Sequence, residues 1–128
     1  AAQACATGGA ILLVAECREG VGGPEYAELL RSEASPRGLL DRFESDGHLT
    51  VHDQWQAQVQ AMVQARCEVW LRSSLDRAAV ASAHLRHAPD VTSTLAAIAG
   101  SKRAELGRQP TVCVLPFGQL TVPRVDRG

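Results

Sequence analysis

The sequence is poor in aromatic residues: Phe, Trp and Tyr together make up 4% of its 128 residues. Ala, Leu and Val must therefore build most of a hydrophobic core. Neither sign of charge is in surplus, because 13 Lys and Arg stand against 14 Asp and Glu and give a formal net charge of −1. That balance excludes a strongly basic nucleic-acid-binding protein, whose affinity for phosphate comes from surplus cations.

Long apolar runs are also absent. The longest uninterrupted one, residues 10–15, is far shorter than the about 20 residues that cross a bilayer. No basic segment precedes it, as one would in a signal peptide. Hydrophobic residues at 45% and charged residues at 21% are typical of a packed domain rather than of disorder. We expect a single cytoplasmic domain over residues 1–128, with neither nucleic acid nor membrane as a partner.

The cysteines show no metal-binding or redox spacing. The four of them, Cys5, Cys17, Cys67 and Cys113, include no CxxC pair. A disulfide framework is typical of smaller secreted chains with a poor core. We therefore favour free thiols in a reducing compartment over disulfides.

The first residues are typical of a helix that is already ending. Residues 1–6 have the composition of its last turns, and Gly8 and Gly9 supply a C-terminal stop. Position 1 is not Met. We expect the chain to be the later part of a longer protein.

Strands and helices alternate along the chain. The patterns predict strands at 10–16, 68–72, 84–88 and 111–116, of which the first has no polar alternation and favours burial on both faces. Helices are predicted from Pro24, from Pro36, and over 53–66, 75–83 and 91–106. This alternation predicts an α/β fold, a small doubly wound and mostly parallel sheet of about four strands with helices on both faces.

A glycine-rich turn after the first strand is the first candidate for chemistry. Gly20 and Gly22 match the start of a dinucleotide fingerprint, but Glu25 stands where its last glycine should be. We favour a strand-to-helix turn that needs positive φ. Binding of a small anion by the amides at the start of the helix is the alternative.

No complete active site is visible. Neither His48 with His52 nor His84 with His87 is accompanied by further ligands at a zinc spacing. No G-x-S-x-G motif or P-loop occurs, and the single lysine of the chain, Lys102, is late in a predicted helix. Glu16 and Glu19 offer an acid/base pair on the turn, without any neighbour that would perturb them.

Three stretches in one order are more specific than these motifs. They are GGAILLVAECREG at residues 8–20, DQWQAQ at 53–58 and TVCVLPFGQLTVP at 111–123. Together they resemble the C-terminal domain of the nickel-dependent lactate racemase family. The resemblance spans the chain from end to end, and it is least distinctive over residues 75–106.

The resemblance implies a two-domain enzyme that racemises or epimerises 2-hydroxy acids. In that family the N-terminal domain holds a nickel pincer nucleotide, which takes a hydride from the α-carbon of the substrate and returns it to either face. A pair of histidines in the same domain transfers the hydroxyl proton. None of His48, His52, His84 and His87 inherits that role, so we expect no catalytic residue, metal ligand or bound cofactor in this chain alone.

The C-terminal domain is implied to close over the cleft and to supply part of the substrate pocket. Trp55 matches a pocket-lining tryptophan of the family, and an indole there would exclude water from a hydride transfer. Gln54, Glu16 and Gly20 are weaker substrate-binding candidates on the same rim. A Tyr-Gln-x-x-Lys stretch of the family would fall before Ala1. Packing of Trp55 in the core, on one helix face with Val59 and Met62, is the alternative interpretation.

Two other functions compete with the racemase role. The first is a stand-alone, flavodoxin-like module that binds a small anion at the turn formed by residues 20–23. The second is a structural or interaction domain, of which an exposed apolar patch would be the sign. The racemase role also predicts such a patch, where the companion domain docks.

Overall fold

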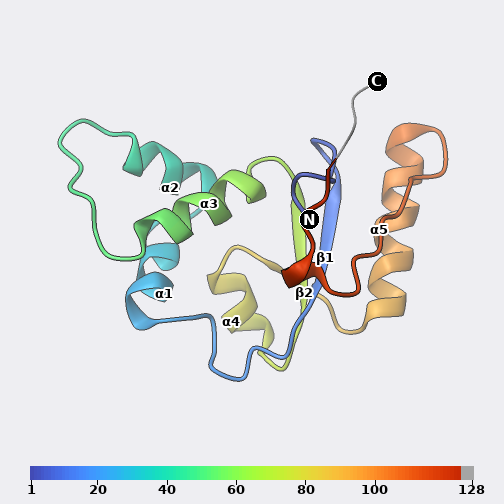
Figure 1. Ribbon diagram of the computed structural model, residues 1–128, viewed down its shortest axis with the longest axis horizontal. Helices are drawn as coiled ribbons and strands as arrows, with labels where there is room; N and C mark the ends of the chain where they lie inside the picture. Colours follow the sequence, from blue (N-terminus) through green and yellow to red (C-terminus); the bar gives the residue numbers. More distant parts are fainter. Residues whose placement is uncertain (125–128) are drawn as a thin grey trace.

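The computed structural model describes residues 1–124, and within that part of the chain a three-stranded parallel sheet forms the centre (Figure 1). Its order is β1 (Ala10–Val14), β2 (Glu68–Arg72), β3 (Arg86–His87). Ile11 is in register with Val69, and Leu71 with His87. The helices are α1 (Pro24–Arg31), α2 (Pro36–Phe43), α3 (Gln54–Gln64), α4 (Arg77–Ser82) and α5 (Val91–Leu106), followed by a 3-10 turn, η1 (Gly118–Leu120).

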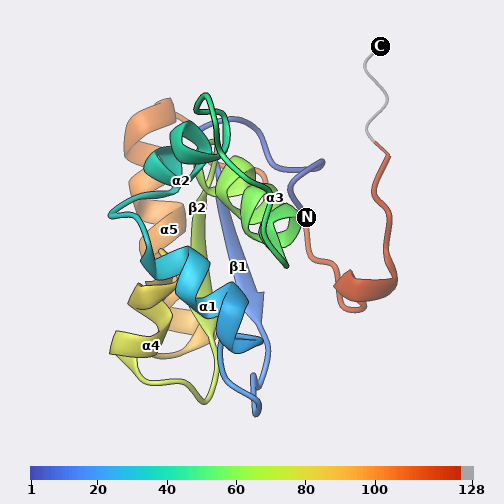
Figure 2. The ribbon, with the colours of Figure 1, turned by 90° about the vertical axis from the view of Figure 1, so that its left-hand side faces the viewer.

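The helices cover both faces of the sheet. Helices α1 to α4 lie on one face and α5 lies on the other, as both ribbon views show (Figures 1 and 2). The chain therefore crosses to the opposite face only after β3, which is the arrangement of a doubly wound sheet. The predicted fold class is confirmed. No helix in residues 1–124 is both long and apolar enough to cross a membrane.

Local capping explains where several helices begin. Pro24 and Pro36 stand at the first helical position, where a missing N–H costs nothing. The carboxylate of Asp76 accepts the N–H of Ala79 at 2.7 Å, and that of Asp90 accepts the N–H of Ser93 at 2.8 Å. These contacts fix the start of α4 and of α5.

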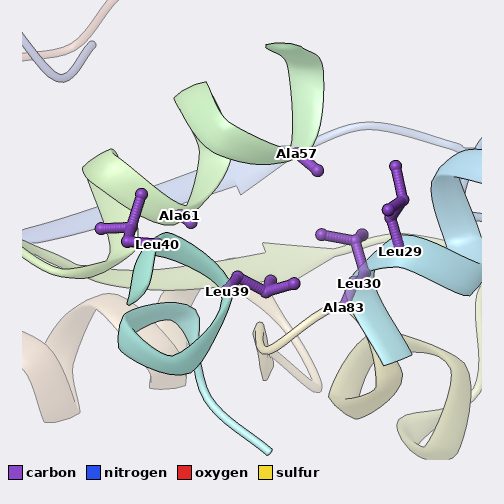
Figure 3. Packing of buried hydrophobic residues seen from close by; sticks show 7 residues of the cluster. All are labelled: Leu29, Leu30, Leu39, Leu40, Ala57, Ala61 and Ala83. Carbon is purple, nitrogen blue, oxygen red and sulfur yellow. The ribbon is translucent and has the colours of Figure 1, made fainter. Parts of the chain in front are cut away.

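The main core lies between α1, α2 and α3 and the α4–β3 turn (Figure 3). Its buried residues are Leu29, Leu30, Leu39, Leu40, Ala57, Ala61 and Ala83. Helix α3 contributes only alanines to this cluster, and their small side chains allow the leucines of α1 and α2 to pack closely against it. A second cluster, formed by Ile11, Cys67 and Val69, joins β1 to β2.

The predicted fourth strand is wrong. Residues 111–116 are mostly exposed and form no strand, so the described part of the sheet has three strands rather than about four. The β-branched composition of this segment favours extended backbone, but a strand also needs an edge to pair with, and local sequence does not supply that. As a result β1 is an edge strand, and Val14 is 65% exposed instead of buried on both faces.

The other strands and the first residues also differ from prediction in detail. The predicted strand 84–88 shrinks to Arg86–His87, because His84 has a left-handed φ of 56° and belongs to the turn after α4. Residues 1–6 form a turn rather than a regular helix, in which the carbonyl of Ala1 accepts the N–H groups of Ala4 and Cys5.

All four cysteines are free thiols. The thiols of Cys5 and Cys67 both reach the carbonyl oxygen of Ala6, at 3.6 and 3.5 Å. Burial, with the neighbouring Cys67 as a smaller cause, raises the pKa of the Cys5 thiol to about 11. Cys5 therefore stays protonated at neutral pH and acts as a packing residue.

Candidate functional site

The chain leaves β1 at the carboxyl end of the sheet, where ligands bind in folds of this class. The carbonyl of Glu16 accepts hydrogen bonds from the N–H of Ser74, at 3.1 Å, and from the hydroxyl of Ser74. The loops that follow β1 and β2 are therefore tied together at this end. The side chain of Glu16 is exposed and pairs with Arg18 at 2.7 Å.

The glycine turn continues from this loop to the start of α1. Gly20 and Gly22 have φ of 88° and 130°, so the predicted need for positive φ is confirmed. A Cβ on Gly22 would lie 2.9 Å from the ring of Tyr26, so this turn packs directly onto α1. A Cβ on Gly23 would lie 3.9 Å from a carboxylate oxygen of Asp53, which brings the turn next to the start of α3.

Helix α3 begins in an unusual way. Asp53, the residue before it, has a left-handed φ of 60°, and its side chain makes no capping hydrogen bond. One carboxylate oxygen instead accepts the side-chain N–H of Gln56 at 3.0 Å, and the other lies 3.2 Å from Nδ1 of His52. This start sets the direction in which the first residues of α3 project.

Trp55 lies on the outer face of α3. It is 68% exposed, and Val59 and Met62, one and two turns further on, are each 55% exposed. We call these three residues the α3 stripe. The buried face of the helix consists instead of Gln54, Ala57 and Ala61. Core packing of Trp55 with Val59 and Met62 is therefore wrong, and the indole is available to a ligand or to another domain.

Gln54 does not share the position of Trp55. It is 8% exposed, and its Oε1 accepts hydrogen bonds from Nε2 of His48 at 2.8 Å and from the N–H of Val51 at 3.2 Å. The structure thus brings the glycine turn to the start of α3, where Trp55 is exposed, and it directs the amide of Gln54 into the preceding loop.

The four histidines are dispersed. His48 packs against Phe43, with ring centroids 5.6 Å apart. His84 holds the carbonyl of Leu30 with Nε2 at 2.7 Å, His87 lies on the β3 edge of the sheet, and His52 is exposed. No group of three or more His, Cys, Asp or Glu side chains in residues 1–124 could hold a metal ion.

The remaining polar clusters have structural roles. The hydroxyl of Tyr26 donates to Gln60, whose amide donates to the carbonyl of Ala83 at 2.9 Å, and burial raises the pKa of Tyr26. On the other face, Lys102 lies 3.3 Å from Glu68 and 2.9 Å from Glu105. The contacts of Tyr26 and Gln60 join α1 to α3 and to the turn before β3. The contacts of Lys102 join α5 to β2.

Two cavities lie away from the candidate residues. One of about 470 Å³ is lined by Gln64, Glu68 and Lys102 among others, and one of about 430 Å³ by Trp70, Arg77 and His87 among others. Neither is lined by Trp55, Glu16 or Gly20. Of the candidate residues, Trp55, Glu16 and Gly20 are exposed, whereas Gln54 is buried.

Sequence reasoning missed the outward position of Val59 and Met62. The sequence QWQAQVQAMVQ of α3 contains no charged residue. A helix whose polar face meets only water normally carries charges there. The absence of charge in α3 was therefore the signal that could have identified its exposed face as a contact surface.

Together these features define a doubly wound α/β domain with an exposed apolar stripe along α3. Residues 1–122 match the family described as lactate racemase C-terminal domain, and the chain belongs to this family. The family predicted from the three sequence stretches is confirmed.

Two comparisons give the extent of the likeness. A lactate racemase of Thermoanaerobacterium thermosaccharolyticum is 34% identical over 61 residues, which are 47% of this chain and 14% of that protein. The solved structure of the lactate racemase apoprotein from the same organism has a TM-score of 0.71 and 26% identity, over 77% of this chain and 24% of that one. The chain thus spans about a quarter or less of these relatives.

Proposed function

We propose that this domain is one half of the substrate cleft of an enzyme that racemises or epimerises 2-hydroxy acids of the lactate type. Membership of the lactate racemase C-terminal domain family is the observation that carries the proposal. Residues 1–128 are then the C-terminal domain of a longer, two-domain isomerase and are inactive alone. The free thiols of the domain are compatible with a cytoplasmic location, where they would stay reduced.

A companion domain on the N-terminal side completes this proposal. It would hold the nickel pincer nucleotide and the proton-transferring histidines that the family resemblance implies. That group, when bound, supplies an acceptor for the hydride of the substrate α-carbon. The lengths support a companion domain, because the likeness covers 77% of this chain but only 24% of the solved lactate racemase.

The part that this chain plays is to cover the substrate. Trp55 projects from the first turn of α3, and Asp53, just before that turn, approaches Gly23 of the glycine turn. An exposed indole in this place would pack over the substrate when the domains close. It would exclude water from a reactive 2-keto acid intermediate, which solvent would otherwise intercept.

The isotope at the α-carbon tests this function. The full-length enzyme with its native cofactor is given lactate with deuterium at C2, in ordinary water. Reversible hydride transfer predicts racemised lactate that retains deuterium at C2. Racemisation with loss of deuterium to solvent would contradict hydride transfer, and a full-length protein that racemises no 2-hydroxy acid would contradict the function itself.

A further inference from the structure

We propose that the α3 stripe is the surface on which the companion domain packs, with Val59 and Met62 as docking residues beyond the substrate pocket. The proposal rests on the proposed two-domain enzyme. Three large apolar side chains lie on one face of α3 at positions i, i+4 and i+7, each more than half exposed. The opposite face of the helix, with Ala57 and Ala61, packs against the core of this domain.

The residue composition of α3 is typical of a protein–protein interface. All its polar residues are glutamines, and none of its residues is charged. The neighbouring helices differ, since α1 and α2 both carry Arg and an acidic residue. The buried centre of a protein interface is depleted in charge and enriched in Trp and Met, and a tryptophan is a frequent anchor of binding energy. The partner surface is therefore expected to be apolar and uncharged.

The position of the first residues supports a preceding domain as the occupant. Val63, which follows Met62, packs against the same buried cluster as Ala2 and Cys5. The first residues of the chain therefore lie at this end of α3, and the views place the N-terminus near that helix (Figures 1 and 2). A domain that precedes residue 1 would emerge beside the stripe. About three quarters of the solved relative lies outside the part that this chain covers, so such a domain has the size to cover it.

A second copy of the chain is the weaker occupant. Covering the whole stripe with another copy would also cover Trp55 and would close the substrate pocket proposed above. The companion domain can instead stay in contact with Met62 while the cleft opens at Trp55. The two residues are seven positions apart, which is about 10 Å along a helix.

The test measures whether position 62 is covered in the whole enzyme. Met62→Cys is introduced into the full-length protein, and the rate at which a maleimide alkylates the new thiol is followed by peptide mass spectrometry. Leu106→Cys is the matched control, because Leu106 is 52% exposed and lies at the end of α5 on the other face of the sheet. Both substitutions replace exposed side chains and leave the core untouched.

The expected result is that, in the monomeric full-length enzyme, the thiol introduced at position 62 reacts at least about tenfold more slowly than the one introduced at position 106. After unfolding, the two rates should be equal. Rates within about threefold of each other in the folded enzyme would overturn the docking surface. So would protection that disappears on dilution, because that result assigns the stripe to a second copy.

This outcome is separable from that of the proposed function. If Trp55→Ala impairs racemisation but the thiol at position 62 reacts freely, the docking surface is wrong and the function stands. If that thiol is protected but the enzyme racemises no 2-hydroxy acid, the docking surface stands and the function is wrong.

Discussion

The side-chain oxygen of Gln54 lies 2.8 Å from Nε2 of His48 and also accepts the N–H of Val51 at 3.2 Å. The side-chain oxygen of an amide can only accept hydrogen bonds, so Nε2 of His48 is the donor in this contact. The loop before α3 is thereby fixed to the first residue of the helix. The adjacent residue Trp55 projects outward from the same turn, so one of these two neighbouring site candidates is buried and the other is exposed.

Gln54→Ala tests the structural role of the buried amide. The substitution removes two partly buried hydrogen bonds, from Nε2 of His48 and from the N–H of Val51. Each such bond contributes about 0.5–1.5 kcal/mol, which makes about 1–3 kcal/mol for the two. We expect the free energy of unfolding in urea to fall by about that amount. Gln58→Ala is the control in the same helix, because the Gln58 side chain makes no hydrogen bond within residues 1–124 and its loss should change stability by less than about 0.5 kcal/mol. Equal effects of the two variants would contradict the role of Gln54.

Trp55→Ala tests the substrate pocket. Since the side chain is mostly exposed, we expect the thermal stability of the domain to change little. In the full-length enzyme kcat/KM should fall by about tenfold or more, which corresponds to about 1.4 kcal/mol of lost transition-state stabilisation. Trp55→Phe should recover part of the loss. Unchanged kinetics in both variants would remove Trp55 from the pocket.

Replacement of two glycines by alanine should change the stability of the domain in opposite directions. A Cβ on Gly9 would lie 2.6 Å from Sγ of Cys5 and 2.8 Å from the carbonyl oxygen of Ala6, so Gly9→Ala should destabilise the domain by about 1–3 kcal/mol. Gly100 lies within α5, and apart from its chain neighbours and the backbone of that helix no atom lies within 4 Å of its Cβ position, so Gly100→Ala should stabilise the domain by about 0.5–1 kcal/mol. Urea unfolding of both variants checks the pair, and a loss of stability in Gly100→Ala would contradict the open space beside α5.

The carboxylate cap at the start of α5 predicts that the stability of this helix start depends on pH. Hydrogen bonds from the hydroxyl of Ser93, and then from its N–H, hold the pKa of Asp90 below its ordinary value. A carboxylate with a lowered pKa stabilises the fold above its unfolded pKa, and this contribution disappears as the pH falls through the folded pKa. The amide resonance of Ser93 should therefore titrate with a midpoint below about 3.9, the ordinary value for Asp.

Asp90→Asn provides the control for that titration. Asn is a good helix cap and does not ionise, so the Ser93 amide resonance should stay constant over the same acid range. A midpoint at or above the ordinary value in the unmodified protein would show that the cap does not favour the carboxylate form. Titration that persists in Asp90→Asn would assign the pH dependence to another group.

Local sequence patterns predicted well where helices and strands lie, but they predicted poorly which face of a helix or strand is buried. The glycine turn, the proline starts of α1 and α2 and the strand β1 all follow from short-range steric rules, and all are present. The periodicity of Trp55, Val59 and Met62 left open that they form the buried face of α3, yet the core receives Ala57 and Ala61. Alanine allows close packing on leucines, and which face packs depends on contacts distant in sequence.

The candidate site was predictable only in part for the same reason. Family-like residues located Trp55, but the direction of Gln54 depends on His48 and Val51, which no spacing rule connects to it. The expected strand at 111–116 does not form. Its β-branched composition is a local property, whereas a strand also needs a neighbouring strand that is distant in the sequence. The lack of charge in α3, in contrast, can be seen in the sequence and agrees with an exposed contact surface.

The most direct test of the account is the conversion of one lactate enantiomer by the full-length enzyme with its native cofactor. Pure L-lactate is supplied, and D-lactate is measured by chiral chromatography over time. The account predicts an approach to equal amounts of the two enantiomers, slowed by Trp55→Ala and not by the surface control Leu106→Ala. If neither lactate nor any longer 2-hydroxy acid changes configuration at C2, the proposed racemase role is wrong.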